Sequence, residues 1–446
     1  MTGNMPEILL YSPQDTPRVA YFTRIVFEVF RSLPYRIVHS ADTFLAYQGP
    51  KINYSPAPIA GQEKEIFLPA TGLLFETGCG AKKPESVQGM PFPAFFPVTI
   101  RGTDFPFDLP AMVFYFLSRY EEYQPFRADR FGRFPASESL AQSHGILHLP
   151  LIDFWLNRLY EALCSRWRIP AIPVPNYRFL PTYDVDIAWA YLHRPWWRQL
   201  LSLAKAAGNK DIASLRARLK VWSGHQDPYD QYARLHSLHR QYGYEPLYFF
   251  LLGNYARLDR NISHRSRALQ ALIKDHTPFA GLHPSMASNF KEGRLKLEKS
   301  RLEAITGMPA INTRQHYLYL AFPETYRLLE AAGFKMDFSM GFADAPGFRA
   351  GTGTPFPWYD LAAERESKLW IQPFQVMDVT LREYLHLDPP DARDIILPIL
   401  RECRAHGTTF CSLWHNSSFS EEEGWKEWPE MYNWLLEEAN NFFSLH

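Results

Sequence analysis

The feature that most constrains the fold is a regular alternation of short apolar runs and helix-length amphipathic stretches after the first third of the chain. Some runs are almost wholly apolar, such as PLYFFLL at 246–252. Such runs are typical of strands that helices cover on both faces. Alternation over roughly 250 residues predicts a parallel sheet, and about seven units favour its closure into a barrel. The expected strands are 178–184, 246–252, 278–283, 310–317, 334–338, 371–379 and 408–415.

A proline-rich connector separates this part from the first third. Pro170, Pro173 and Pro175 stand close together, and proline at that density blocks regular structure. At ~150 residues per domain, the length suggests two or three domains. We expect a smaller α/β or α+β domain over 1–175, divisible into 1–90 and 91–175, and the barrel over 176–446.

Composition excludes several classes of protein. Lys plus Arg and Asp plus Glu both number 47, and this balance argues against nucleic-acid binding and lends no support to binding of acidic membranes. The four cysteines form no C-x-x-C pair, so they predict neither a disulfide framework nor a thiolate zinc site. No secretory signal is visible and no apolar run approaches the ~18 residues of a membrane span, so we expect a cytoplasmic protein. The oligomeric state is left open.

Ionisable residues cluster near the ends of the expected strands. In strand order they are Asp184 and Asp186, His283, Arg314 and His316, Asp337, and His415. Functional residues of parallel α/β barrels lie at these carboxyl ends. Side chains alternate along a strand, so Asp184 and Asp186 face the same side. Asp and His together suit a divalent ion such as zinc, so their convergence predicts a site, although each residue alone also has an ordinary structural explanation.

The motifs TYDVD, GLHPS, NTRQH, MDFS and LWH, in that order over residues 178–440, resemble those of the polysaccharide deacetylases. These are the NodB-homology proteins of carbohydrate esterase family 4. In the first third, FDLPAMVFYFLSRYEEY resembles the signature of an uncharacterised N-terminal domain in a bacterial subgroup. The resemblance implies a distorted parallel (β/α)7 barrel. It also implies a metal-dependent hydrolase of non-peptide C–N bonds, which removes an acetyl group from an N-acetylated sugar or polysaccharide.

The resemblance also implies roles for individual residues. By match to the motifs, the base is Asp184, the metal ligands include Asp186 and His283, the arginine that orients the base is Arg314, and the general acid is His415. The position of the family's second histidine ligand holds Ala287. Either Asp337 or Asp378 is expected to orient the general acid.

The third metal ligand therefore has to come from elsewhere, because a catalytic zinc normally keeps three protein ligands. We hypothesise that His316 completes the set, since strand alternation places it on the same side as the orienting arginine; Ser285 or Ser288 is the alternative source of oxygen. The expected cofactor is a divalent metal, zinc first, with Co²⁺, Mn²⁺ and Ni²⁺ as alternatives. If the site forms, the nearest polar atoms of Asp186 and His283 lie within about 7 Å.

In the expected reaction a metal lowers the pKa of its bound water to about 7 and polarises the acyl carbonyl. Asp184 takes the proton of the attacking water, and His415 protonates the departing amine. The expected partner is a carbohydrate. We expect substrate contacts from Trp414, Tyr317 and Arg349, with Trp358 as a further stacking aromatic.

Two other functions remain open. One is a metal-poor, catalytically impaired carbohydrate-binding or scaffold protein, and the other is a hydrolase of another non-peptide C–N bond, such as a small amide. The retained base, arginine and acid favour the deacetylase. No G-x-S-x-G elbow is present, which disfavours a serine hydrolase. The glycine-rich segment at 344–354 lacks G-x-G-x-x-G, which disfavours nucleotide binding.

Overall fold

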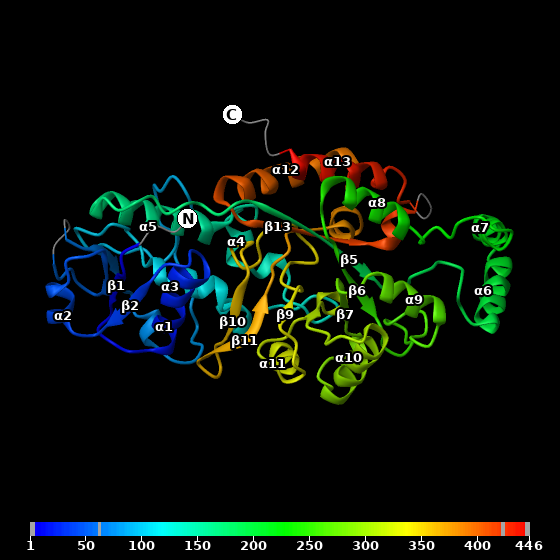
Figure 1. The fold of residues 1–446 in the computed structure, drawn as a ribbon, viewed down its shortest axis with the longest axis horizontal. Coiled ribbons are helices and arrows are strands. Elements are labelled where there is room, and N and C mark those ends of the chain that lie inside the picture. Colours follow the sequence, from blue (N-terminus) through cyan, green and yellow to red (C-terminus); the bar gives the residue numbers. More distant parts are fainter. Residues whose placement is uncertain (1–4, 61–63, 421–423, 442–446) are drawn as a thin grey trace.

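The protein is a mixed α/β structure with two sheets, seen in a computed structural model that describes residues 5–60, 64–420 and 424–441 (Figure 1). The first third of the chain forms a four-stranded sheet of order β2-β1-β3-β4. The remainder forms a nine-stranded sheet of order β10-β11-β9-β8-β7-β6-β5-β13-β12.

The small sheet is parallel throughout. Its strands are β1 (Ile8–Tyr11), β2 (Tyr35–Val38), β3 (Lys51–Ser55) and β4 (Ile66–Pro69). The helices of this region are α1 (Pro17–Arg24), α2 (Ala41–Ala46), α3 (Leu109–Leu117), α4 (Leu140–Ser143) and α5 (Leu151–Trp167). Residues 169–177 form neither helix nor strand, as the prolines predict, and the domain boundary near 175 remains a prediction.

Helix α3 joins the two sheets. All of its residues are buried, and it contacts β4 of the small sheet and β10 of the large one. A helix that is apolar all round is stable only when other elements cover it on every side. Asp108 caps its first turn by accepting a hydrogen bond from the Ala111 N–H at 2.8 Å. The first third therefore packs directly against the β10–β11 edge of the large sheet.

The large sheet contains every strand that the alternation predicts. The predicted strands are β5 (Arg178–Val185), β6 (Leu247–Leu251), β7 (Ala280–His283), β8 (Asn312–Thr313), β9 (Met336–Asp337), β12 (Val376–Met377) and β13 (Thr409–His415). The apolar alternation does not reveal the antiparallel hairpin of β10 (Phe356–Asp360) and β11 (Arg365–Ile371). Charged residues interrupt β11, so it does not read as a buried apolar run.

Closure of the sheet into a barrel is not confirmed. Among the described residues, the pairings leave β10 and β12 as the two edges. Eight neighbouring strands, from β11 to β12, run parallel, so their carboxyl ends share one edge of the sheet. This common edge, rather than closure, positions the site.

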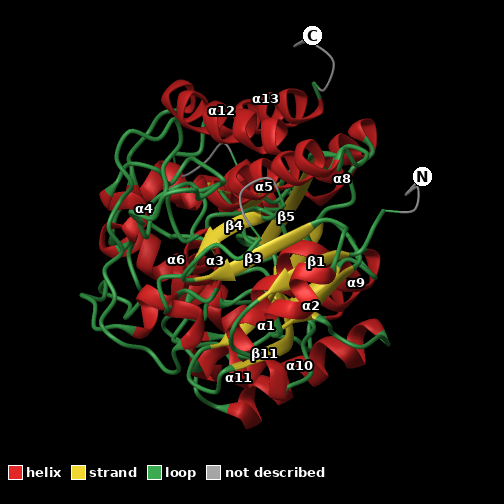
Figure 2. Cartoon of the chain, turned by 90° about the vertical axis from the view of Figure 1, so that its left-hand side faces the viewer, coloured by secondary structure: helices red, strands yellow, loops and turns green. Residues whose placement is uncertain are grey.

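Helices cover the large sheet on both sides. They are α8 (Tyr232–Tyr242), α9 (Arg267–Asp275), α10 (Glu292–Thr306), α11 (Glu324–Ala331), α12 (Pro389–His406) and α13 (Trp428–Asn440). Figure 2 shows α12 and α13 on one side of the strands and α10 and α11 on the other. Two further helices, α6 (Trp196–Gly208) and α7 (Ile212–Trp222), project from the body (Figure 1). Within the described ranges, no helix combines the length and apolar character needed to cross a membrane.

Candidate active site

A cavity of about 400 Å³ lies where the parallel strands of the large sheet end. Six of the predicted site residues line it: Asp184, Asp186, His283, His316, Tyr317 and His415. They come from segments that are far apart in the chain, and the parallel pairing of β5, β6, β7 and β13 brings them together. The cavity is thus the candidate active site.

Three of these residues form a group that could hold a metal ion. Asp186, His283 and His316 each offer one ligand atom, and these atoms lie within 4.8 Å of one another. The Nε2 atom of His283 is 3.2 Å from Asp186 Oδ1, well inside the separation that the sequence analysis requires. The Nε2 atom of His316 is 3.7 Å from Asp186 Oδ2. These are the three residues that the sequence predicts as metal ligands, with His316 as the third.

Hydrogen bonds at the opposite ring nitrogens orient both histidines. Nδ1 of His283 lies 2.6 Å from the carbonyl oxygen of Arg314, and Nδ1 of His316 lies 3.0 Å from Asp259 Oδ1. In protein metal sites, histidine ligands almost always donate their second N–H to a carbonyl or carboxylate, which fixes the tautomer. Both Nε2 atoms are thereby left free to face Asp186.

The residues present fit a divalent cation. Asp186 Oδ1 is buried and accepts no hydrogen bond from the part of the chain that the structure describes. A buried carboxylate oxygen without a partner is costly, and a cation would satisfy it. Burial raises the pKa of Asp186, but the two histidines outweigh burial and hold it well below its usual value. Burial lowers the pKa of His316, whereas Asp186 and Asp259 outweigh it and raise that pKa to about 9, so the pocket attracts positive charge.

Asp259 takes part in the site although the sequence analysis did not predict it. Its carboxylate accepts hydrogen bonds from the N–H groups of Met286 at 2.7 Å and Ala287 at 3.2 Å. The turn that carries Ala287 therefore anchors the aspartate that orients His316. Asp259 lies in the loop after β6 and not directly at the end of the strand, so the pattern of polar strand ends did not reveal it.

The serine alternatives for the third ligand have other partners. Ser285 Oγ donates to the Glu298 carboxylate, and Ser288 Oγ donates to the Ser285 carbonyl oxygen at 2.7 Å. Both serines are buried in these contacts, and neither lines the cavity. The geometry therefore favours His316.

Arg314 holds Asp184 in a fixed orientation. Both side chains are buried, and Arg314 Nη1 donates to Asp184 Oδ1 at 2.9 Å. Its other nitrogens donate to Thr182 Oγ1 at 2.7 Å and to the Phe338 carbonyl oxygen at 3.0 Å. A guanidinium held at three points can orient a carboxylate and compensate its charge. The second oxygen of Asp184 is 3.7 Å from His283 Nε2, next to the metal group.

Asp378 is the partner of His415. Its Oδ1 lies 2.9 Å from His415 Nδ1, and its Oδ2 accepts the backbone N–H of His415 at 2.7 Å. Burial lowers the pKa of His415, but Asp378 outweighs it, and the pKa rises to about 10. Asp337, the alternative, instead accepts hydrogen bonds from a tyrosine and a serine.

The tryptophans expected to stack on a sugar are buried. Trp414 precedes His415 on β13, and neighbouring residues on a strand point to opposite faces. It packs against Tyr432 and Trp428 of α13, away from the cavity. Trp358 of β10 packs against Tyr326 of α11. Neither ring lines the cavity, so this structure does not place the two tryptophans where they could stack on a sugar there.

Arg349 was also expected to contact substrate, but it is buried in an ion pair. Its Nε and Nη2 donate to the two carboxylate oxygens of Glu122 at 2.9 and 2.5 Å. The glycine-rich segment that carries it lies against the first third of the chain. Gly347 has φ 128° and approaches the Leu147 carbonyl oxygen so closely that a Cβ would lie 2.3 Å from it. Arg349 therefore joins two parts of the chain.

Tyr317 lines the cavity together with residues from the first third of the chain. The ring of Phe131 lies 5.0 Å from that of Tyr317. Arg133 Nη1 donates to the Tyr317 carbonyl oxygen at 2.7 Å. Tyr317 has φ 59°, a strained conformation for a non-glycine residue, and the arginine stabilises it. The first third, to which the sequence analysis assigned no role, thus supplies part of the cavity wall.

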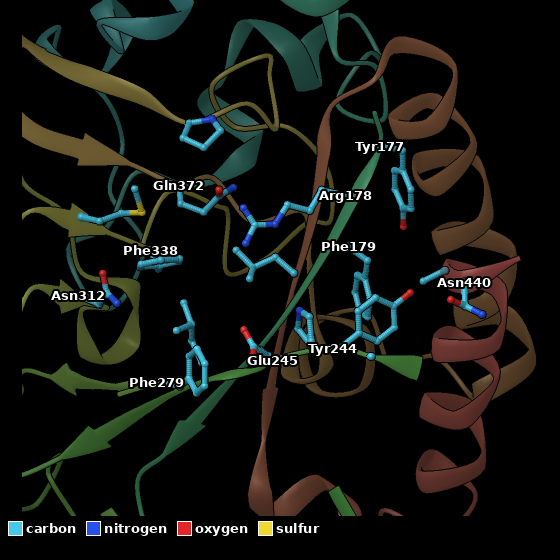
Figure 3. Close-up of a pocket in the computed structure, with 17 residues that line it drawn as sticks. Tyr177, Arg178, Phe179, Tyr244, Glu245, Phe279, Asn312, Phe338, Gln372 and Asn440 are labelled. Carbon is cyan, nitrogen blue, oxygen red and sulfur yellow. The ribbon is translucent and has the colours of Figure 1, made fainter. Parts of the chain in front are cut away.

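A second cavity, of about 590 Å³, lies at the amino ends of the strands. Figure 3 shows Arg178, Glu245 and Asn312 around it, at or next to the starts of β5, β6 and β8. None of the predicted site residues lines it. In parallel α/β folds the chemistry is found at the other ends of the strands, so we assign this cavity no catalytic role.

Comparisons with known proteins give little direct guidance. The model of a family of unknown function, DUF7033, matches residues 8–168, which is less than half of the chain. A search of curated proteins finds no match.

Solved structures resemble the chain only distantly. A Mycobacterium smegmatis protein assigned as a polysaccharide deacetylase is 14% identical, with 61% of this chain and 87% of that chain covered and a TM-score of 0.40. A polysaccharide deacetylase from Bacillus cereus is 13% identical, with 59% and 88% covered and a TM-score of 0.28. PuuE allantoinase is 11% identical, with 59% of this chain and 84% of that chain covered and a TM-score of 0.35. These scores carry no argument about function, which has to rest on the site itself.

Proposed function

We propose that the protein is a metal-dependent hydrolase that removes an acetyl group from an N-acetylated sugar or polysaccharide. One observation carries the proposal. Two histidines and one carboxylate that could hold a metal line the same cavity as two further ionisable residues. These are Asp184, which Arg314 orients, and His415, which Asp378 orients. Metal-assisted hydrolysis with a separate base and acid needs these parts together.

Asp186, His283 and His316 would hold the ion. A divalent ion in such a site supplies Lewis acidity and lowers the pKa of a bound water. Two histidines and a carboxylate are the ligand set of several catalytic zinc sites, and they leave a position open. Zinc is therefore the first choice, with Co²⁺, Mn²⁺ and Ni²⁺ as alternatives.

Asp184 acts as the base. Arg314 fixes one of its oxygens, while the other faces His283, on the side of the metal group. A carboxylate held in this way can accept a proton from a water molecule without reorientation. The arginine has no path to the substrate, because it is buried and its nitrogens are engaged by protein groups.

His415 acts as the acid. Asp378 binds its Nδ1 atom, so that Nε2 is available to the leaving group. The raised pKa keeps the imidazole protonated at neutral pH. The departing nitrogen of an amide needs a proton because an amine anion is a very poor leaving group.

Phe131 and Tyr317 form an aromatic wall beside the metal group. Both rings are half-buried and line the cavity, and Tyr317 also packs against His316 with ring centroids 4.5 Å apart. The apolar face of a sugar ring can lie against such rings. A cavity of about 400 Å³ is within the range of small-molecule sites. We infer that these two aromatics replace the tryptophans as the sugar-binding platform.

Metal content and acetate release test the proposal. The wild type, reconstituted with zinc and dialysed, is expected to hold about one equivalent and to release acetate from N-acetylated sugar oligomers. Asp186→Asn and His283→Ala are expected to lose metal and activity, whereas Asp184→Asn loses activity but keeps metal. Asp391→Asn, an exposed aspartate on α12, is the control.

Unchanged metal content in both ligand variants would remove the proposed site. Metal binding together with hydrolysis of small amides only would favour the other C–N hydrolase. Absence of metal from the reconstituted wild type would favour the binding or scaffold protein.

A further inference from the structure

The α6–α7 hairpin exposes an unusual amount of apolar surface. The most exposed large residues are Trp196 (73%), Leu201 (62%), Leu219 (60%), Ile212 (58%) and Leu200 (56%). Figure 1 shows the two helices projecting from one end of the molecule. Contiguous apolar surface of this kind marks an interaction site in most proteins.

The exposed residues form one stripe on each helix. On α6, Trp196, Trp197, Leu200 and Leu201 recur at the spacing of a single helical face. On α7, Ile212, Leu219 and Trp222 are exposed, and their spacing also places them near one face of the helix. A stripe of this kind is normally buried against another element, but on this hairpin it faces outward.

The hairpin is also strongly basic. Between residues 194 and 220 the sequence has seven Lys and Arg residues and a single acidic residue, Asp211. The whole chain has a net charge of zero, so this excess is local and is hidden in the overall composition. A helix with Trp and Leu on one face and Lys and Arg around it is typical of segments that lie in the interface of an anionic membrane.

We propose that the α6–α7 hairpin binds an anionic lipid surface. The basic charge of the hairpin decides between two candidate partners for its apolar face, a second copy of the hairpin and an anionic lipid surface. Two copies of this hairpin packed face to face would bring two basic surfaces together, and like charges oppose such a contact. An anionic lipid surface satisfies both features, because it accepts tryptophan and leucine at its interface and attracts the basic residues.

The hairpin is linked to segments that carry residues of the candidate active site. It follows β5, the strand that carries Asp184, and the Asp227 carboxylate anchors its base by accepting the N–H groups of Ala190 and Tyr191 at 2.8 Å. The guanidinium of Arg198 lies 3.7 Å from the ring centre of Tyr255, in the same loop as Asp259. Docking would therefore tether the loop that carries Asp259, and with it the candidate active site, to the lipid surface. If the proposed function holds, the hairpin selects a sugar that is attached to a lipid.

Co-sedimentation with vesicles tests the docking. The full-length protein is expected to sediment with phosphatidylcholine vesicles that contain phosphatidylglycerol, and not with pure phosphatidylcholine. The double variant Leu200→Glu/Leu201→Glu and the charge variant Lys205→Glu/Arg216→Glu are each expected to lower binding at least ~10-fold. Leu297→Glu, at an exposed leucine of α10, is the matched control and is expected to bind like the wild type.

Far-UV circular dichroism and thermal unfolding establish that the variants fold. Absence of wild-type sedimentation with anionic vesicles would overturn the proposal, and so would equal loss in the Leu297→Glu control. A dimer in light scattering that the double leucine variant abolishes would instead assign the face to a second copy. Asp184→Asn is expected to retain vesicle binding, so failure of the hydrolase proposal and failure of the docking proposal are distinguishable.

Discussion

His415 lies directly opposite Asp184 in the register of the parallel strands β13 and β5. Residues that are paired in this way point to the same face of a sheet, and both line the cavity. The proposed acid and the proposed base are therefore placed side by side by backbone hydrogen bonds. Each then has a buried partner of opposite charge, Asp378 for the histidine and Arg314 for the aspartate.

The pH profile tests the role of Asp378. His415 is active in its protonated form, so a pKa of about 10 predicts activity that persists to about pH 10 and falls above it. In Asp378→Asn the largest charge that raises this pKa is absent, and the alkaline limb of kcat/KM is expected to move down by roughly 2 to 3 units toward the ordinary value near 6.5. Asp337→Asn, the aspartate with other partners, is expected to leave the limb in place. An unchanged alkaline limb in Asp378→Asn would show that Asp378 does not set the pKa of the proposed acid.

Replacement of Arg314 by lysine tests how the base is oriented. Lysine keeps the charge but cannot donate simultaneously to Asp184, Thr182 and the Phe338 carbonyl oxygen in the same fork. We expect kcat to fall ~100-fold or more with metal content unchanged, because misplacement of a base costs that much. Steady-state kinetics and metal analysis on the same preparation check this. Full activity of the lysine variant would show that its charge alone suffices.

Asp259→Asn tests the support of the third ligand. An amide can turn its NH₂ toward His316 Nδ1 and select the wrong tautomer, so we expect metal affinity to fall ~10- to 100-fold. Titration with zinc in a competing chelator measures this. Asp230→Asn, at an aspartate outside the cavity, is the control. Unchanged affinity would mean that His316 is not a ligand or does not need its partner.

Stability depends on the buried charges that join the first third of the chain to the large sheet. Glu122 accepts hydrogen bonds from Arg349 and from Arg119, and all three side chains are buried. In Arg349→Met one buried partner is lost, and we expect the free energy of unfolding to fall by about 3 to 5 kcal/mol. Arg158→Met disrupts an exposed pair with Glu161 and is expected to cost less than about 1 kcal/mol. Urea unfolding followed by circular dichroism compares the two variants. Equal losses of unfolding free energy would show that the buried pair of Arg349 and Glu122 contributes no more than the exposed pair.

Phe131→Ala tests whether the first third of the chain contributes to substrate binding. The ring packs against Tyr317 and lines the cavity, so we expect kcat/KM for sugar oligomers to fall ~10-fold through KM, with metal content unchanged. Phe290→Ala removes an exposed phenylalanine outside the cavity and serves as the control. A wild-type KM in Phe131→Ala would exclude the aromatic wall.

Local pattern was sufficient to locate the strands of the large sheet other than β10 and β11, and the polar residues at their ends. Burial on both faces leaves an apolar run that can be read directly, as in β6, and alternation places Asp184 and Asp186 on one side. The hairpin β10–β11 was missed because charged residues interrupt one of its strands. The roles assigned to the site residues remain predictions.

The sequence by itself therefore determined which segments are the buried apolar strands and which ionisable groups follow them, because both are local properties of the chain. Only the tertiary structure decided which of two aspartates orients His415, that Asp259 supports His316, and that Trp414 faces a helix instead of the cavity. It also decided that residues near 131 reach the site and that Arg349 does not. Each of these depends on contacts between residues far apart in the chain, which packing selects and no local pattern encodes.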